Sequence, residues 1–151
     1  MEILPQQFRI PEIYGDYWFN SEPLSLGALR GHVILIDFWD YSCHKCIQTL
    51  PYVKEWNKRY VDKGLVTIGV HTPQFPFATD PVNVRKAIDN LHIRYPVVMD
   101  NNYVIWGAFR SMVWPTKYLV DRSGYIRYIQ PGEGSYQGFE QASQALLTEA
   151  G

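Results

Sequence analysis

The stretch that decides the fold is His32–Trp39, with the sequence HVILIDFW, followed by Cys43–Cys46, with the sequence CHKC. The first segment is a short and nearly continuous apolar run rich in β-branched side chains, which is typical of a strand buried on both faces. From Cys43 to Lys63 the apolar residues recur at spacings of three and four, which predicts a helix that ends at Gly64. The sequence therefore predicts a buried strand, a turn that carries two cysteines, and a helix.

Further apolar segments extend this unit along the chain. We expect strands at Leu65–Val70, Tyr95–Met99, Thr116–Val120 and Tyr125–Gln130, a helical turn at Leu24–Leu29, and helices at 80–92, 103–110 and 139–149. Residues 1–24 are rich in proline, glycine and aromatic residues, which predicts an irregular arm with one short strand or hairpin. Strands that alternate with helices, followed by a closing hairpin and helix, predict an α/β sandwich with a mostly parallel centre.

Length and composition indicate a single domain over residues 1–151. The chain has 151 residues, of which 46% are hydrophobic and 19% are charged, so it can bury a core. Its net charge of −1 predicts no nucleic-acid partner and no binding to anionic membranes. The longest apolar run, Val33–Ile36, is much shorter than the roughly 20 residues of a membrane-spanning helix. Two cysteines are too few for a disulfide scaffold or a four-ligand zinc site.

The first residues, Met1–Pro5, contain neither a cationic segment nor an apolar stretch of signal-peptide length. We therefore expect a cytoplasmic protein. An extracytoplasmic or periplasmic location is the alternative, because a trimmed or fused domain would have the same sequence. We also expect a monomer.

Cys43 and Cys46 carry the chemistry that the sequence predicts. Residues three apart on a helix share a face, so the two sulfur atoms can close a small disulfide ring. At a helix N-terminus, unpaired N–H groups and the helix dipole favour the thiolate of Cys43, and a thiolate is the attacking species in disulfide exchange. Cys46 then resolves the mixed disulfide. Structural thiols and half of a zinc site are the alternatives, and the lack of a second cysteine pair favours the redox centre.

Several motifs resemble those of the thioredoxin superfamily. The sequence DFW at 37–39 lies just before the cysteines, Pro51 lies in the helix after them, and WPT at 114–116 opens a later strand. Segments 20–26, 37–43 and 69–73 resemble the TlpA-like redoxins, in particular the soluble DipZ-type domains. This resemblance implies a thioredoxin-like three-layer sandwich with a mixed central sheet and helices on both faces. It also implies a strand–helix insertion around residues 72–93 and an N-terminal arm at 1–15.

The same resemblance implies a thiol–disulfide oxidoreductase that reduces protein disulfides, with Cys43, Cys46 and Asp37 as catalytic residues. Asp37 matches a buried acid behind Cys46, where a carboxylate can pass a proton to or from the sulfur. Pro115 is expected to follow a cis peptide bond and to face the cysteines, and the backbone at Trp114 to pair with the client peptide. Many relatives carry a glutamate where this chain has Gln74, so we expect Asp37 to act alone.

Side chains around the cysteines set the remaining expectations. His44 and Lys45 replace the Gly-Pro pair of thioredoxin-type sites and are expected to tune the redox potential. Trp39 and Trp114 are expected to form an apolar lip that binds substrate. No cofactor and no metal are expected, because electrons pass through the Cys43–Cys46 disulfide itself. The partners implied are a disulfide-containing protein client and a separate thiol reductant.

Two alternative functions stay open. A thiol peroxidase of the peroxiredoxin type has a Pro-xxx-Thr-xx-Cys pattern, but the corresponding positions before Cys43 are Ile36 and Asp40. A non-enzymatic copper-binding chaperone would use Cys43, Cys46 and His71 as ligands.

Overall fold

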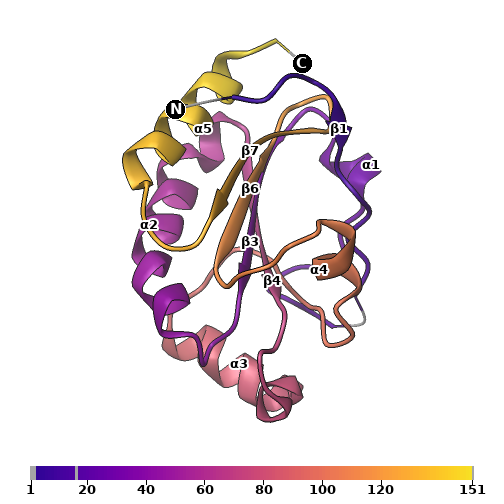
Figure 1. Cartoon of the computed structure of the whole chain (residues 1–151), viewed down its shortest axis with the longest axis vertical. Coiled ribbons are helices and arrows are strands. Elements are labelled where there is room, and N and C mark those ends of the chain that lie inside the picture. The colour runs from indigo at the N-terminus through magenta and orange to yellow at the C-terminus, as the bar shows by residue number, and fades with distance from the viewer. Residues whose placement is uncertain (1–2, 16, 151) are drawn as a thin grey trace.

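A mixed sheet forms the middle layer of the protein (Figure 1). The computed structural model describes residues 3–15 and 17–150, and within them seven strands pair in the order β1-β7-β6-β3-β4-β5-β2. Strands β3, β4 and β5 are parallel, whereas β6, β7, β1 and β2 pair antiparallel with their neighbours. The strands are β1 Phe8–Arg9, β2 Trp18–Phe19, β3 Val33–Trp39, β4 Leu65–His71, β5 Val97–Met99, β6 Thr116–Val120 and β7 Tyr125–Pro131.

Helices cover both faces of this sheet, as the resemblance implies (Figure 1). One face carries α2, α3 and α5, and the opposite face carries α1 and α4. The helices are α1 Leu26–Leu29, α2 His44–Tyr60, α3 Pro81–Asn90, α4 Val104–Ala108 and α5 Tyr136–Thr148, with 3-10 turns at Val61–Lys63 and Pro76–Thr79. The predicted three-layer α/β architecture is therefore confirmed.

Strand β3 is buried on both faces because its side chains alternate between two cores. Leu35 and Trp39 belong to the core beneath α2 and α5, whereas Ile36 and Phe38 belong to the core on the other face. All seven residues of β3 are buried. The continuous apolar run in the sequence thus reflects a central strand with a helical layer on each side.

The N-terminal arm differs from its predicted form. The sequence pattern predicts one short strand or hairpin, but β1 and β2 do not pair with each other. Strand β1 pairs with β7, and β2 pairs with β5 at the opposite edge of the sheet. Between them, Ile10 and Ile13 are buried in the same core as Phe38. The arm therefore crosses the face that carries α1 and α4, and residues 1–2 of the expected 1–15 segment lie outside the described residues.

The strand–helix insertion expected around residues 72–93 differs in order and extent: a helix comes first, and the strand that follows it, β5, lies beyond residue 93. Its helix is α3, which begins after Asp80, whose carboxylate accepts a hydrogen bond from the backbone N–H of Val82 at 2.9 Å. Pro81 occupies the first turn, where its missing N–H has no cost. Strand β5 then adds to the edge of β4. The insertion therefore extends the sheet beyond β4, on the side away from β3.

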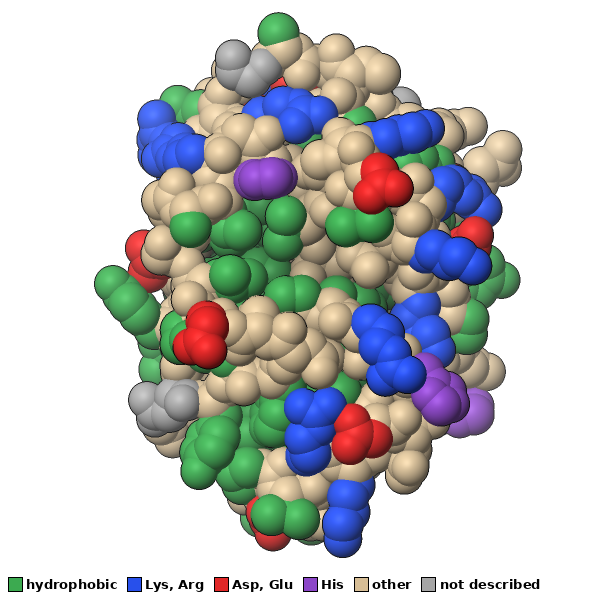
Figure 2. Space-filling model, turned by 180° about the vertical axis from the view of Figure 1, so that it is seen from behind, with side chains coloured by type: hydrophobic (Ala, Val, Ile, Leu, Met, Phe, Trp, Pro, Cys, Tyr) green, Lys and Arg blue, Asp and Glu red, His purple; other side chains and the backbone are tan. Residues whose placement is uncertain are grey.

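The surface carries charges of both signs. On the face shown in Figure 2, hydrophobic side chains gather across the centre, and acidic side chains interrupt the basic ones around them. This mixture agrees with the net charge of −1. Among the described residues, we find no helix with the length and hydrophobicity needed to cross a membrane.

Candidate active site

Four chain segments meet at one end of the sheet. Trp39 at the end of β3 pairs with His71 at the end of β4, and His71 pairs with Met99 at the end of β5. The start of β6 joins them, because Thr116 pairs with Phe38. The turn that carries the cysteines, the loop after β4 and the loop before β6 therefore lie together. Loops at the carboxyl ends of parallel strands are the usual place for a functional site in α/β proteins.

Cys43 and Cys46 form a disulfide at the start of α2, with their Cα atoms 5.2 Å apart. Cys43 is the N-cap of the helix, and its sulfur accepts a hydrogen bond from the backbone N–H of Cys46 at 3.1 Å. This N–H and the helix dipole also favour a thiolate on Cys43 once the disulfide is reduced. Cys43 is 7% exposed and Cys46 is 2% exposed, so Cys43 is the more accessible of the two cysteines.

Asp40 joins two of the loops, a role that the sequence did not reveal. Its buried carboxylate accepts hydrogen bonds from the backbone N–H of Ser42 at 2.8 Å and from the Ser42 hydroxyl at 2.9 Å. It also accepts one from the backbone N–H of Gln74 at 2.7 Å. Asp40 therefore holds the loop after β4 against the turn before Cys43, and Gln74 takes part through its backbone.

The loop before β6 contains the cis peptide bond that the resemblance implies, between Trp114 and Pro115. The indole N–H of Trp114 donates a hydrogen bond to the carbonyl of Thr72 at 2.8 Å. Its ring stacks on Trp106, with the ring centroids 3.9 Å apart, and packs against the core that contains both cysteines. Trp114 thus fixes the proline loop against the loop after β4.

The expectation that Trp39 forms a lip around the thiols is wrong. Trp39 is only 2% exposed, and its ring packs edge-on against His71 with the centroids 4.9 Å apart. The side chain of Trp39 points into the core because the pleat of β3 places it on the same face as Leu35. A client chain can reach the partly exposed Trp114 but not Trp39.

His71 is a buried structural residue. Its Nε2 atom accepts a hydrogen bond from the backbone N–H of Tyr41 at 3.2 Å and lies 3.7 Å from a carboxylate oxygen of Asp40. Burial lowers the pKa of His71 to about 4, against the opposing effect of Asp40, so the imidazole is neutral at pH 7. Within residues 3–15 and 17–150 no three His, Cys, Asp or Glu side chains are grouped to hold a metal ion. The geometry therefore offers no support for the copper-chaperone alternative.

Asp37 lies on the side of the sheet that faces the cysteines. It follows Leu35 and precedes Trp39 on the same face of β3, and both of those residues pack in the core that contains Cys46. Burial raises the pKa of Asp37 to about 7, and the charge of Lys117 partly opposes this. One carboxylate oxygen of Asp37 has no hydrogen-bond partner. A carboxyl group with this pKa can both accept and release a proton near neutral pH.

Lys117 is the charged residue that the sequence analysis missed. It lies opposite Asp37 in the pairing of β3 with β6, and it is 0% exposed. Its amino group has no hydrogen-bond partner and lies 5.8 Å from the ring centroid of Phe139. Burial lowers the pKa of Lys117, and Asp37 and Glu133 oppose this shift. The sequence contains a signal for this residue, because Lys117 interrupts the strand predicted at Thr116–Val120. A lysine that is buried in a strand is rare without a partner.

Comparisons with known proteins agree with this geometry. The model of a family described as AhpC/TSA matches residues 8–129. The chain belongs to the AhpC/TSA family. Protein DipZ of Mycobacterium bovis is 46% identical over 136 residues, a match that covers 88% of this chain and 20% of DipZ. The chain therefore spans about a fifth of that relative's length.

Two further proteins match this chain over nearly their whole length. The thiol–disulfide oxidoreductase YkuV of Bacillus subtilis is 28% identical over 141 residues, covering 93% of this chain and 95% of YkuV. A thioredoxin-like protein solved in its oxidized form superimposes with a TM-score of 0.86 at 28% identity, covering 98% of this chain and 100% of that one. This AhpC/TSA member is therefore a TlpA-like domain of the thioredoxin superfamily.

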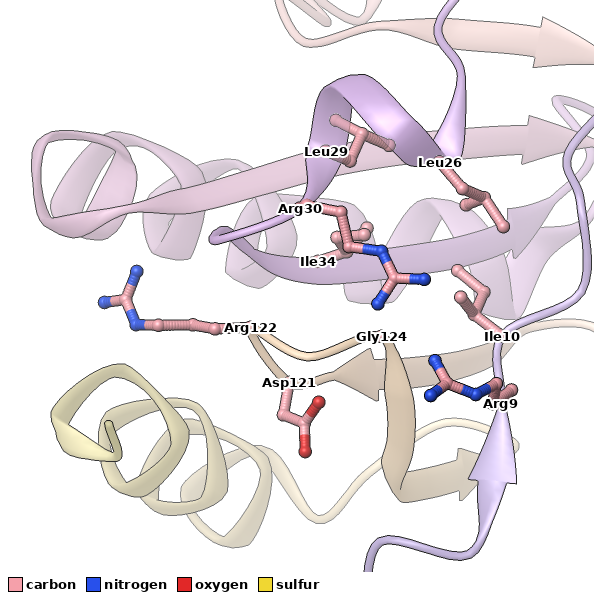
Figure 3. Close-up of a pocket in the computed structure, with 9 residues that line it drawn as sticks. All are labelled: Arg9, Ile10, Leu26, Leu29, Arg30, Ile34, Asp121, Arg122 and Gly124. Atoms are coloured by element: carbon pink, nitrogen blue, oxygen red, sulfur yellow. The ribbon is translucent and has the colours of Figure 1, made fainter. Parts of the chain in front are cut away.

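A cavity lined by residues near the start of β3 lies away from the disulfide (Figure 3). It encloses about 40 Å³ and is lined by three arginines, Arg9, Arg30 and Arg122. Each guanidinium already donates a hydrogen bond, to the hydroxyl of Tyr125 and to the carbonyls of Ser123 and Gly31 respectively. These arginines tie the turn after β6 to the arm and to the start of β3.

Replacing Lys117 with methionine should raise the pKa of Asp37 above its value of about 7. The substitution removes the cation that opposes the effect of burial and leaves a side chain of similar length in the core. The pKa can be followed by NMR titration of the carboxyl carbon. The exposed Lys58 on α2 gives a matched control, Lys58→Met, which should leave the pKa of Asp37 unchanged. An unchanged titration in both variants would show that Lys117 does not act on Asp37.

Proposed function

We propose that this thiol–disulfide oxidoreductase domain acts as a reductase of protein disulfides, with Cys43 as the attacking residue and Cys46 as the resolving residue. The observation that carries the proposal is the Cys43–Cys46 disulfide at the start of α2, where the Cys43 sulfur caps the helix. The helix terminus favours a thiolate on Cys43, and the thiolate is the nucleophile in disulfide exchange.

The reaction proceeds in two exchanges. The Cys43 thiolate attacks one sulfur of the client disulfide, forms a mixed disulfide and releases the first client thiolate. The Cys46 thiol gives its proton to the Asp37 carboxylate, and the resulting thiolate attacks the Cys43 sulfur. This step closes the Cys43–Cys46 bond and releases the second client thiolate. A separate thiol reductant then supplies two electrons and two protons, which restore both thiols.

The surrounding residues support this sequence of steps. We assign Asp37 the proton transfer because its raised pKa matches a proton acceptor near neutral pH. We assign Pro115 and the backbone at Trp114 to the groove for the client peptide, since their loop packs against the core with the cysteines. In this scheme the disulfide itself carries the electrons, no bound cofactor takes part, and the domain acts as a monomer.

The redox potential tests the direction of the reaction. His44 and Lys45 are exposed in the first turn of α2, which contains no acidic residue. We expect these two side chains to stabilise the thiolate of Cys43 and to raise the potential by roughly 13–43 mV above the about −270 mV of thioredoxin, with Asp37 and Asp40 opposing the rise. We expect between about −230 and −260 mV from glutathione equilibria.

The control for this measurement is a variant of the two residues between the cysteines. The double substitution His44→Gly and Lys45→Pro should move the potential downward. A wild-type potential above about −180 mV, in the range of disulfide isomerases, would contradict the assignment as a reductase.

A thiol peroxidase is the rival within the AhpC/TSA family, and the site geometry disfavours it. At the position of the peroxiredoxin threonine, Asp40 uses its carboxylate to accept three hydrogen bonds. An ionised carboxylate accepts hydrogen bonds but donates none, unlike a threonine hydroxyl. We therefore expect negligible turnover of hydrogen peroxide with a thiol reductant, under conditions in which the protein reduces insulin. Peroxide turnover faster than insulin reduction would favour the peroxidase.

A further inference from the structure

A groove lies between α2 and the segment that joins α3 to β5. It has a volume of about 490 Å³, and we call it the side groove. The residues that line it include Pro51, Lys54, His92, Arg94 and Tyr95. The amino group of Lys54 donates a hydrogen bond to the carbonyl of Leu91 at 2.7 Å, which fixes α2 against the end of α3. The two walls of the side groove are therefore held at a set distance.

Tyr95 reaches from the side groove to the middle of the sheet. Its side chain is 4% exposed and packs in the same core as Trp39 and Cys46. A Cβ atom at Gly69 would lie 3.4 Å from the Cε1 atom of Tyr95, the ring atom bonded to the carbon that carries the hydroxyl. Gly69 pairs with Asp37 in the parallel register of β4 and β3, and paired strands lie about 4.8 Å apart. The hydroxyl end of Tyr95 therefore lies over β4, next to the strand that carries Asp37.

Polar groups without partners border the space over Gly69. The same Cβ position lies 3.0 Å from the indole nitrogen of Trp39. Within the part of the chain that the structure describes, neither this N–H nor one carboxylate oxygen of Asp37 has a hydrogen-bond partner. Buried polar groups are nearly always paired, so an unpaired donor and an unpaired acceptor beside Gly69 indicate a place where protons move. Glycine keeps this space open, because any added side chain would press on Trp39 and Tyr95.

The proposed cycle needs a way out for the proton on Asp37. Each closing of the disulfide leaves one proton there, and the reductant brings the protons that restore both thiols, so this proton must reach solvent before the next closing. Cys43 is 7% exposed and Cys46 is 2% exposed, so the disulfide itself gives solvent little access. We propose that Tyr95 is the relay through which Asp37 exchanges its proton with solvent in the side groove. The inference rests on the proposed reductase function and adds a residue to its proton chemistry.

The hydroxyl group of Tyr95 can accept one proton and donate another in the same step. The carboxyl group of Asp37 gives its proton, over Gly69, to the hydroxyl oxygen, while the hydroxyl releases its own proton to water in the side groove. Asp37 ends as a carboxylate, Tyr95 ends neutral, and one proton has reached solvent. Burial raises the pKa of the Tyr95 hydroxyl well above its usual range, and the charge of Asp37 adds to this shift. Tyr95 therefore stays protonated near neutral pH and passes protons on without storing charge.

The variant Tyr95→Phe tests the relay because it removes only the hydroxyl. NMR line shapes of the Asp37 carboxyl carbon, recorded on the oxidised protein near the titration midpoint of about pH 7, give the rate at which this group exchanges its proton. We expect the exchange to slow about 10- to 100-fold in the variant. The midpoint should stay near pH 7, because the remaining ring keeps the carboxyl group buried. A merely structural role of the hydroxyl would change the midpoint or the stability and leave the exchange rate as it is.

The matched control is Tyr118→Phe, which removes a buried hydroxyl from the other side of the sheet. Tyr118 is 3% exposed and packs in the core on the opposite face, where its hydroxyl forms a hydrogen bond with that of Ser111. This variant should leave the exchange rate of Asp37 unchanged. Gly69→Ala tests the path with the Tyr95 hydroxyl in place. Its added Cβ atom enters the space over β4 and should also slow the exchange.

The outcomes separate the relay from the proposed function. An unchanged exchange rate in Tyr95→Phe would overturn the relay, and an unchanged rate in Gly69→Ala would overturn its path over β4. Equal slowing in Tyr118→Phe would also overturn it, because the effect would not be local. None of these measurements needs a client disulfide. If the exchange slows in Tyr95→Phe but the wild-type protein fails to reduce insulin, the relay stands and the proposed reductase function is overturned.

Discussion

Replacing Cys46 with serine should convert the protein into a trap for its clients. Cys43 keeps its place at the N-terminus of α2 and still attacks a disulfide, but no second thiol remains to release the mixed disulfide. A covalent complex of the protein with its client should accumulate to about one equivalent. It should survive treatment with an alkylating agent, and dithiothreitol should separate it by reducing the mixed disulfide. Non-reducing electrophoresis and intact mass measurement would quantify it.

The companion variant Cys43→Ser should abolish activity, by about 10³-fold or more in kcat/KM, because the covalent nucleophile is lost. The remaining Cys46 is 2% exposed and lacks the capping position, so it should trap no client. The two serine variants are each other's controls, since each removes one sulfur from the same turn. Trapping by the Cys43 variant and none by the Cys46 variant would reverse the roles of the two residues.

The elements next to the cysteines were predictable because local physics determines them. The ends of β3 and α2 are predicted to within a few residues. The signals are an apolar run rich in β-branched residues, two cysteines at the start of a helix, and a glycine after the helix. Gly64 adopts a φ of 106°, which favours glycine, so its role as a helix terminator was also readable. The strand Thr116–Val120 has the bounds that the sequence predicts.

Features that depend on contacts between distant segments were not predictable in the same way. The sequence shows a tryptophan at 39, but only the pairing of β3 with β4 places its ring inside the core against His71. The sequence of the N-terminal arm contains short aromatic segments, but nothing in it predicts that β1 and β2 pair with strands at opposite edges of the sheet. The sequence shows that Asp40 departs from the peroxiredoxin pattern, but its hydrogen bond from the backbone N–H of Gln74 depends on how two loops meet.

The pairing of Asp37 with Lys117 shows the same limit at the chemical centre. Each residue alone looks like a polar interruption of an apolar strand. The antiparallel register of β3 and β6 places them side by side, and both are buried. A buried carboxyl group and a buried amine shift each other's titration, so the proton chemistry of the site belongs to the pair. Tyr95 is also affected: burial raises the pKa of its hydroxyl, and the charge of Asp37 adds to this shift.

Replacing Asp37 with asparagine should change stability in a pH-dependent way. The carboxyl group has a pKa of about 7 in the folded protein and 3.8 as its reference value. Its contribution to stability is therefore fully present below about pH 3.8 and is lost as the pH rises to about 7. At 1.36 kcal/mol per pKa unit, the loss is about 4 kcal/mol. The asparagine variant lacks this loss, so its free energy of unfolding relative to wild type should rise between pH 4 and pH 7, as urea titrations would show.

The same substitution should slow the resolving step, with an effect that fades at high pH. Without the carboxylate, Cys46 must ionise unaided, and a free thiol with a pKa of about 8.5 is only a few per cent thiolate at pH 7. We expect the closing of the Cys43–Cys46 bond to slow about 10- to 100-fold at pH 7, and less than about threefold at pH 9. Stopped-flow tryptophan fluorescence with a mixed-disulfide substrate would measure this step.

A lysine left without its partner could itself disturb the site, so the control removes both charges. In the single variant Asp37→Asn, Lys117 remains in the core, and Glu133 is the carboxylate that still acts on it. The double variant Asp37→Asn/Lys117→Met leaves neither ionisable group of the pair in the core. If proton transfer by Asp37 is the cause, both variants show the same steep pH dependence, because both lack the acceptor. If the unpaired lysine is the cause, the double variant recovers the wild-type profile. Kinetics unchanged from pH 6 to pH 9 in both variants would mean that Asp37 serves the fold and that the proton of Cys46 leaves by another route.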